Sequence, residues 1–151
     1  MGLRRVELVT HGPEETRAVG RTLGVNARAG DVILLVGTLG AGKTCLTQGI
    51  VWGLGLDEYA RSPTFVLVNQ YDGRLVLYHV DLYRLETPAE IADLGLDEYL
   101  LGEGVCVVEW AEKGLEVLPR QHLMVRIEYF GERSRRLTFT ASDRGYAGLL
   151  S

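Results

Sequence analysis

The feature that most constrains this chain is a phosphate-binding loop that joins a buried strand to a helix. Residues 37–44 read GTLGAGKT and fit the pattern G-x-x-x-x-G-K-[ST]. The preceding run, DVILLV at 31–36, is rich in branched side chains and typical of a strand buried on both faces of a parallel sheet. Residues 43–54 carry an apolar stripe at helical spacing. This order of strand, loop and helix indicates a nucleotide site of the P-loop class rather than a chance glycine-rich turn.

Each position of the loop has a physical role in holding phosphate. Gly40 and Gly42 permit backbone conformations that a side chain forbids, so that N–H groups can point inward and cradle phosphate oxygens. The following helix adds its positive N-terminal end. Lys43 is predicted to bridge the terminal phosphates, and the Thr44 hydroxyl is predicted to coordinate Mg²⁺. Nucleotide contacts are expected from seven consecutive residues: Leu39, Gly40, Ala41, Gly42, Lys43, Thr44 and Cys45.

A P-loop also needs a carboxylate at the end of a neighbouring strand, where it holds magnesium or its waters. Glu109 ends the apolar run 105–108, and Asp81 ends the alternating run 75–80. The more apolar strand favours Glu109 as the magnesium residue, which leaves Asp81 to orient or deprotonate the attacking water. These two residues and Lys43 are therefore the predicted catalytic groups. His79 alternates with Asp81 and should point to the same face, and we expect a structural role for it.

The remaining segments complete an α/β pattern. Asp72-Gly73 lies between two strand-like runs and predicts a hairpin. Thr87-Pro88-Ala89-Glu90 is a capping box that predicts a helix continuing to about Leu100. Strands mixed with helices indicate a P-loop NTPase-like three-layer domain with a mixed, mostly parallel central sheet, formed as a single domain by residues 1–151. The other segments are predicted strands at 5–10, 65–71, 105–110, 124–129 and 136–140, and a predicted helix at 13–24.

Composition narrows the class of protein. The chain has 151 residues, 46% of them hydrophobic, which suffices for one core. Its apolar runs are far shorter than the roughly 20 residues that span a bilayer, and we expect a cytoplasmic protein without membrane contact. The net charge of -4 argues against binding nucleic acid mainly through the chain's own charge. The basic run Arg133, Arg135 and Arg136 is interpreted as a solvated turn and edge strand, and Cys45 and Cys106 as reduced core residues.

Four segments occur together in a characteristic order. They are the loop at 37–44, SPTF at 62–65, HVDLYRL at 79–85 and VVEWAE at 107–112. In order and spacing they resemble the TsaE-type ATPases of bacterial tRNA threonylcarbamoyladenosine biosynthesis. The resemblance covers nearly the whole chain, and the combination is far more specific than the P-loop alone.

The resemblance implies an ATPase that uses ATP and Mg²⁺. It implies work with the partner proteins TsaB and TsaD, which place a threonylcarbamoyl group on the adenosine next to the anticodon, so that tRNA is met only through the complex. Lys43 and Thr44 match the phosphate and magnesium positions, Glu109 matches the second magnesium position, and Asp81 lies in the second switch-like segment. The first switch-like segment is 62–64.

The same resemblance offers further candidates around the site. Arg133 and the stretch 11–13 are candidates for nucleotide contacts. Trp110 follows the magnesium glutamate and is expected near the nucleotide or a partner rather than in the deep core. A slow isolated ATPase is also predicted, because the obvious local cations, Arg61 and Arg84, lie in segments that look mobile. Those segments carry three apolar residues that are predicted to form a partner-docking surface: Phe65, Leu82 and Tyr83.

Three other functions are compatible with a P-loop. A small-molecule kinase or phosphotransferase is the main alternative, although the stretch 55–64 carries a single arginine and is short for a lid. A signalling GTPase normally carries N-K-x-D, which this chain lacks. A binding module would hold nucleotide without turnover. The phosphate released from ATP and from GTP, with and without acceptors, distinguishes these possibilities.

Overall fold

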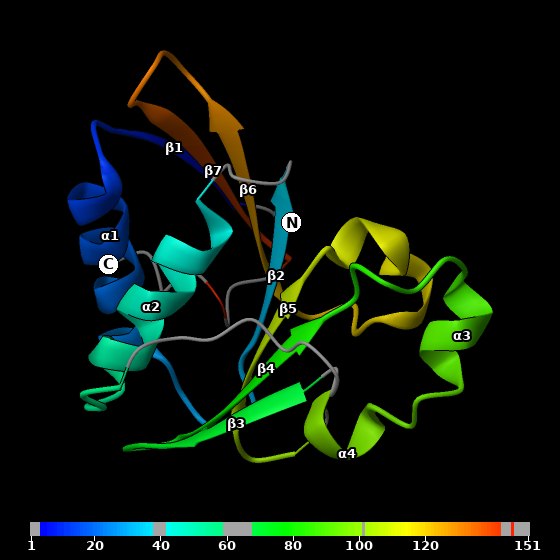
Figure 1. Ribbon diagram of the computed structural model, residues 1–151. Coiled ribbons are helices and arrows are strands. Elements are labelled where there is room, and N and C mark those ends of the chain that lie inside the picture. Colours follow the sequence, from blue (N-terminus) through cyan, green and yellow to red (C-terminus); the bar gives the residue numbers. More distant parts are fainter. Residues whose placement is uncertain (1–3, 38–41, 59–67, 101, 143–145, 147–151) are drawn as a thin grey trace.

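The computed structural model describes residues 4–37, 42–58, 68–100, 102–142 and 146. In this part of the chain, seven strands form one sheet with helices on both of its faces (Figure 1). The strands are β1 (Arg4–Thr10), β2 (Val32–Gly37), β3 (Val68–Asp72), β4 (Val76–Asp81), β5 (Val105–Glu109), β6 (Leu123–Tyr129) and β7 (Arg135–Ala141). The helices are α1 (Pro13–Asn26), α2 (Lys43–Gly53), α3 (Pro88–Ala92), α4 (Asp97–Leu100) and the 3-10 turns η1 (Ala111–Lys113) and η2 (Leu115–Val117).

The sheet has the order β1-β7-β6-β2-β5-β4-β3. Its four central strands, β6, β2, β5 and β4, run parallel, whereas the pairings β1–β7, β7–β6 and β4–β3 are antiparallel. The predicted mixed α/β sheet is therefore confirmed, with its parallel part at the centre. The continuous apolar runs form β5, which is buried at every residue, and β2, which is buried at every residue except Gly37, as expected for strands covered on both faces.

Two hydrophobic cores, one on each face of the sheet, give the predicted three layers. Ile33 and Leu35 of β2 pack toward α1 and α2, whereas Leu34 and Val36 pack toward α3 and α4. The two helical layers lie on opposite sides of the sheet in Figure 1. Because side chains alternate along a strand, one apolar strand serves both cores, and its end is fixed in position by both layers. Each helix in the described segments is too short or too polar to span a bilayer.

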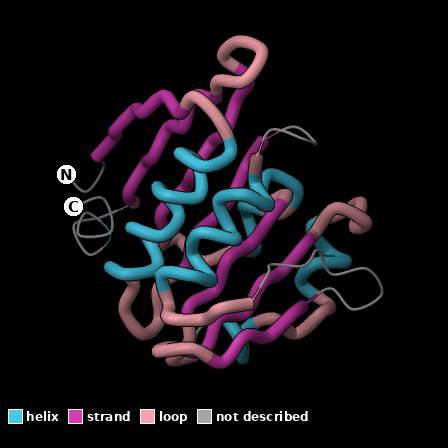
Figure 2. Tube along the Cα trace, turned by 60° about the vertical axis from the view of Figure 1, so that its left-hand side comes forward, coloured by secondary structure: helices cyan, strands magenta, loops and turns pink. Residues whose placement is uncertain are grey.

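Helices α1 and α2 touch backbone to backbone, and Figure 2 shows them side by side across the sheet. A Cβ atom added at Gly20 would lie 2.1 Å from the Leu46 carbonyl oxygen, and one added at Gly49 would lie 2.0 Å from the Arg17 carbonyl oxygen. The glycines of α2 therefore serve the helix contact, although glycine weakens an isolated helix. This contact fixes α2, and with it the end of the phosphate loop, against α1.

The predicted helix from 88 to about 100 is wrong in its length. The cap is present, since the Thr87 side chain accepts a hydrogen bond from the Glu90 backbone N–H at 3.2 Å. The helix ends at Ala92, however, and a second short helix begins at Asp97. Gly95 lies between them with φ +67°, a left-handed conformation that terminates helices. The break lets apolar residues of both pieces reach the same core: Ile91, Leu96 and Leu100.

The predicted hairpin at Asp72-Gly73 is confirmed, with β3 ending at Asp72 and β4 beginning at Val76. The first residues of the strand predicted before the hairpin, 65–67, lie outside the described residues.

Both cysteines are free thiols. Cys106 is buried in β5, where burial raises the pKa of its thiol to about 12. Cys45 is only half-buried on α2, so the prediction of a core position is wrong for that residue.

Candidate nucleotide-binding site

The described ends of the phosphate loop have the geometry that an anion site requires. Gly37 ends β2, and Gly42 stands before α2 with φ +116°, a left-handed conformation that favours glycine. Among the described residues, no side chain caps the N-terminus of α2, and its first turn contains no acidic residue. The N–H groups of this first turn and the positive end of the helix can therefore serve an anion. The predicted contacts Leu39, Gly40 and Ala41 lie outside the described residues.

Lys43 is folded inward at the start of α2. Its side chain is only 5% exposed, its Nζ donates a hydrogen bond to the Gly37 carbonyl oxygen at 2.7 Å, and the same atom lies 3.4 Å from the centre of the Trp110 ring. Burial lowers the pKa of Lys43, and the opposing pull of the carboxylates of Glu109, Glu112 and Asp81 limits that shift. A buried cation is thus held at the loop between a carbonyl and an aromatic face.

The two predicted carboxylates end neighbouring parallel strands and are in register. Asp81 of β4 pairs with Glu109 of β5, and Glu109 also pairs with Leu35, two residues before the loop. Partners in register point to the same side of a sheet, so both carboxylates face the α1–α2 side. Burial raises the pKa of Asp81, and the Glu109 charge adds to that effect, whereas a hydrogen bond from the Tyr83 backbone N–H to Oδ1 at 2.9 Å opposes it.

His79 makes a contact with Glu109 that the sequence did not indicate. Its ring is fully buried, and its Nε2 is hydrogen-bonded to Oε2 of Glu109, which is itself 4% exposed. The expected direction of His79, toward the same face as Asp81, is confirmed, but the purely structural role did not anticipate this contact. The signal was present in the H-x-D alternation of β4. Its meaning depended on the pairing of β4 with β5, about which the sequence carried no local information.

Oxygen donors suited to magnesium are available around the loop. Thr44 lies exposed in the first turn of α2, and Asp81 and Glu109 end the adjacent strands. Mg²⁺ is usually held by one or two protein groups together with phosphate oxygens and waters, so this donor set fits the ion. Within the described residues, no group of three or more histidine, cysteine, aspartate or glutamate side chains could hold a metal by itself.

Trp110 lies at the site rather than in the deep core, as predicted. Its backbone has φ +60°, and it is the one non-glycine residue with positive φ in the described part of the chain. Its half-buried ring contacts Lys43 on one side and the Tyr83 ring, with centroids 5.0 Å apart. Left-handed backbone at a non-glycine residue costs about 1–3 kcal/mol. The surrounding contacts thus hold an unfavourable backbone conformation that turns this ring toward Lys43.

The segment after β4 is anchored more firmly than the sequence suggested. Leu82 is fully buried in the core against α3, so its predicted place on an exposed docking surface is wrong. Lys113 Nζ donates to the carbonyl oxygens of Tyr83 and Leu85, which fixes the chain that was expected to be mobile. Tyr83 is half exposed and Arg84 is exposed, as the docking prediction requires. The other members of that prediction, Arg61 and Phe65, lie outside the described residues.

Arg133 and the N-terminal stretch 11–13 come together, although they are distant in sequence. Arg133 lies exposed in the β6–β7 turn, and its guanidinium would be 3.7 Å from a Cβ atom at Gly12. Gly12 precedes α1, and Thr16 of that helix lies beside the loop end, since Cβ at Gly42 would be 3.9 Å from its methyl group. The two candidates thus lie at the same edge of the loop.

The other two arginines of the basic run lie over aromatic rings: Arg135 lies over the ring of Tyr129, and Arg136 lies over the ring of Phe130.

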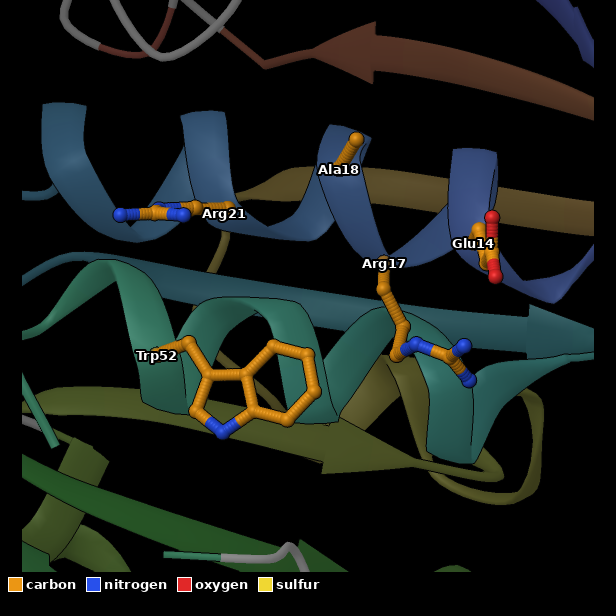
Figure 3. Close-up of a pocket in the computed structure, with 5 residues that line it drawn as sticks. All are labelled: Glu14, Arg17, Ala18, Arg21 and Trp52. Carbon is orange, nitrogen blue, oxygen red and sulfur yellow. The ribbon is translucent and has the colours of Figure 1, made fainter. Parts of the chain in front are cut away.

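A separate cavity of about 330 Å³ lies over the outer surface of α1 and α2 (Figure 3). None of the predicted catalytic or nucleotide-binding residues lines it. Its lining combines acidic, basic and apolar side chains: Glu14, Arg17, Ala18, Arg21 and Trp52. It is therefore distinct from the loop site, but it contains the chain's second tryptophan.

Comparison with known proteins identifies the family. The family model described as "Threonylcarbamoyl adenosine biosynthesis protein TsaE" matches residues 10–137. A Bacillus subtilis protein described as "tRNA threonylcarbamoyladenosine biosynthesis protein TsaE" is 46% identical over 145 residues, covering 95% of this chain and 90% of that protein. A protein of the same description from Treponema pallidum is 38% identical, covering 86% of this chain and 96% of that protein.

A solved structure agrees with these sequence matches. The crystal structure of Bacillus subtilis YdiB is similar with a TM-score of 0.84 and 41% identity, covering 99% of this chain and 93% of that chain. The family match, the identities and this structural likeness all cover the strand–loop–helix unit and the strands that carry Asp81 and Glu109. The chain belongs to the TsaE family of threonylcarbamoyl adenosine biosynthesis proteins.

Proposed function

We propose that this chain binds ATP with Mg²⁺ and hydrolyses the ATP in support of threonylcarbamoyl modification of the tRNA adenosine next to the anticodon. It acts as a single domain in the cytoplasm with partners of the TsaB and TsaD type, and it reaches tRNA through their complex. Family membership supports the pathway, since the relatives carry the description "tRNA threonylcarbamoyladenosine biosynthesis protein". The ATPase activity is supported by the chemistry of the loop site.

The register of Asp81 with Glu109, beside the end of β2, is the observation that carries this proposal. It brings two carboxylates and the buried Lys43 to the carboxyl ends of three adjacent parallel strands, where ligands bind in open α/β sheets. Both carboxylates contribute electrostatically to the lysine, as the direction of their effects on its pKa indicates. Phosphoryl transfer needs this combination of a cation, oxygen ligands and a group that handles the water.

Each residue has a proposed task in hydrolysis. Lys43 leaves the Gly37 carbonyl and the Trp110 ring and binds the terminal phosphates of ATP. Thr44 and Glu109 hold Mg²⁺, which when bound neutralises charge on the phosphate oxygens. Asp81 orients the attacking water and accepts its proton at Oδ2, since Oδ1 is engaged by the Tyr83 N–H. The raised pKa of Asp81 makes its carboxylate a better proton acceptor than an exposed aspartate.

The isolated chain is proposed to be slow because the cation that follows Asp81 of β4 is not yet seated at the site. Arg84 is exposed, and its neighbour Tyr83 presents half of its surface to solvent. A partner that covers this segment would bury the ring and place the guanidinium near the phosphates. Binding energy would then complete the site.

The test of the proposed function is steady-state ATP hydrolysis by the chain alone, with the TsaB and TsaD type pair, and with tRNA added. We expect slow hydrolysis alone and a higher rate with the pair. Lys43→Ala should lose about a hundredfold or more in rate, since one preorganised donor contributes on the order of 3 kcal/mol to the transition state. Normal turnover by Lys43→Ala would refute the loop assignment, whereas equal rates in all three mixtures would remove only partner activation.

A further inference from the structure

We propose that His79 is a positioning residue that holds the Glu109 carboxylate in the orientation required for Mg²⁺. The inference rests on the proposed role of Glu109 as a magnesium ligand and adds a residue of β4 to that task. His79 itself touches neither the nucleotide nor the ion in this proposal. It acts through one hydrogen bond.

The contact has the geometry of a directed donor. The Nε2 atom of His79 reaches Oε2 of Glu109, and both side chains are almost completely removed from solvent. A carboxylate oxygen only accepts hydrogen bonds, so the N–H must be on Nε2. Within the described residues, no other side chain donates to the Glu109 carboxylate. The orientation of that carboxylate therefore depends on His79.

Packing alone does not explain an imidazole at this position. Nδ1 of His79 is buried and has no hydrogen-bond partner in the described part of the chain. A buried polar atom without a partner is unfavourable, and an apolar side chain of similar size would avoid it. The register neighbour of His79 on β5 is Val107, which is itself apolar. Unlike an apolar side chain, the imidazole has an N–H that it can donate to Glu109.

The strand pairing explains why this residue and not another serves Glu109. His79 stands two residues before Asp81 on β4, and Asp81 is the register partner of Glu109. The three side chains therefore share one face, with the histidine on the inner side and the aspartate toward the loop. Hydrogen bonds from such outer partners fix metal ligands, and their removal typically lowers metal affinity about 10-fold to 100-fold.

The experiment measures the magnesium dependence of ADP binding by calorimetry, which needs no turnover. His79→Met substitutes an apolar side chain of similar length and removes the Nε2 N–H donor. His79→Asn keeps a polar group but is too short to reach Glu109. His79→Gln places an amide N–H near the position of Nε2 and is the matched rescue. We expect the Mg²⁺ concentration at half effect to rise about 10-fold to 100-fold in the Met and Asn variants, and to stay within about threefold of the parent in the Gln variant.

The controls separate positioning from folding and from the proposed function. Circular dichroism melting identifies folded variants, and ADP affinity without Mg²⁺ should be unchanged in them. Folded Met or Asn variants with the parent's magnesium dependence would overturn the inference, as would a Gln variant that loses as much as they do. Should neither Met nor Asn fold, the Gln variant must still retain the parent's magnesium dependence, and its failure to do so overturns the inference. Glu109→Ala is the reference: if it leaves magnesium dependence intact, the proposed role of Glu109 itself fails.

Discussion

Replacing Gly20 by alanine should destabilise the chain, although alanine favours helices. The added Cβ would lie 2.1 Å from the Leu46 carbonyl oxygen and 3.1 Å from both Gly49 Cα and Ile50 N. All three atoms belong to the backbone of α2, so no side chain can turn aside. Since real contacts of this kind lie beyond 3.0 Å, the two helices must separate locally by about 1 Å.

Two opposing free energies determine the size of the effect. Alanine gains about 1 kcal/mol over glycine in a helix interior. Overpacking typically costs about 1–3 kcal/mol. A local separation of α1 and α2 by about 1 Å also loses up to about half of the van der Waals energy of the affected contacts. The backbone clash puts the cost at or above the upper end of that range, so the net loss is about 2 kcal/mol. For a chain of this size, that lowers Tm by about 4–8 °C.

The assay is thermal unfolding followed by circular dichroism, with the reverse exchange in the same helix as the control. Ala18 is exposed on α1, so Ala18→Gly reports the helix propensity term alone and should lower Tm by about 2–4 °C. If propensity dominated at position 20, Gly20→Ala would raise Tm by the same amount. A Tm for Gly20→Ala at or above that of the parent would refute the backbone-contact argument.

Three further outcomes follow from the site. Asp81→Asn should lose turnover yet raise Tm at pH 7, because the raised pKa of Asp81 in the folded chain means that the fold disfavours the carboxylate. The Tm difference between variant and parent should shrink as pH falls through that pKa, and a difference that stays constant with pH would contradict the argument. In a Trp52→Phe background, the fluorescence of Trp110 should change when Mg²⁺ and ADP bind, because Lys43 leaves its ring; constant emission would count against that movement. Iodoacetamide should modify Cys45 in the folded chain and Cys106 only after unfolding, as mass spectrometry of the peptides can determine.

The sequence predicted those parts of the molecule whose signals are local. The loop with its flanking strand and helix, the Asp72-Gly73 hairpin and the carboxylates at the strand ends each depend on a few consecutive residues. The two sides of the sheet were readable because a strand such as β2 is apolar at every position.

The errors concern contacts between distant segments. Leu82 follows a charged residue and reads as exposed, but the core beneath α3 buries it. The glycines at 49 and 53 carry no local signal of a helix contact, and their role is visible only with α1 in place. The bond between His79 and Glu109 joins residues 30 positions apart, and it exists only because β4 lies beside β5.

The rings of Tyr83 and Trp110, which contact each other at an interplanar angle of 47°, lie between the loop site and the solvent. Half of Tyr83 faces solvent, its ring touches Trp110, and Trp110 carries the ammonium of Lys43. A molecule bound to the exposed side of Tyr83 would thus be separated from Lys43 by the rings of Tyr83 and Trp110. Side-chain contacts alone therefore connect the solvent-exposed surface at Tyr83 with the buried Lys43.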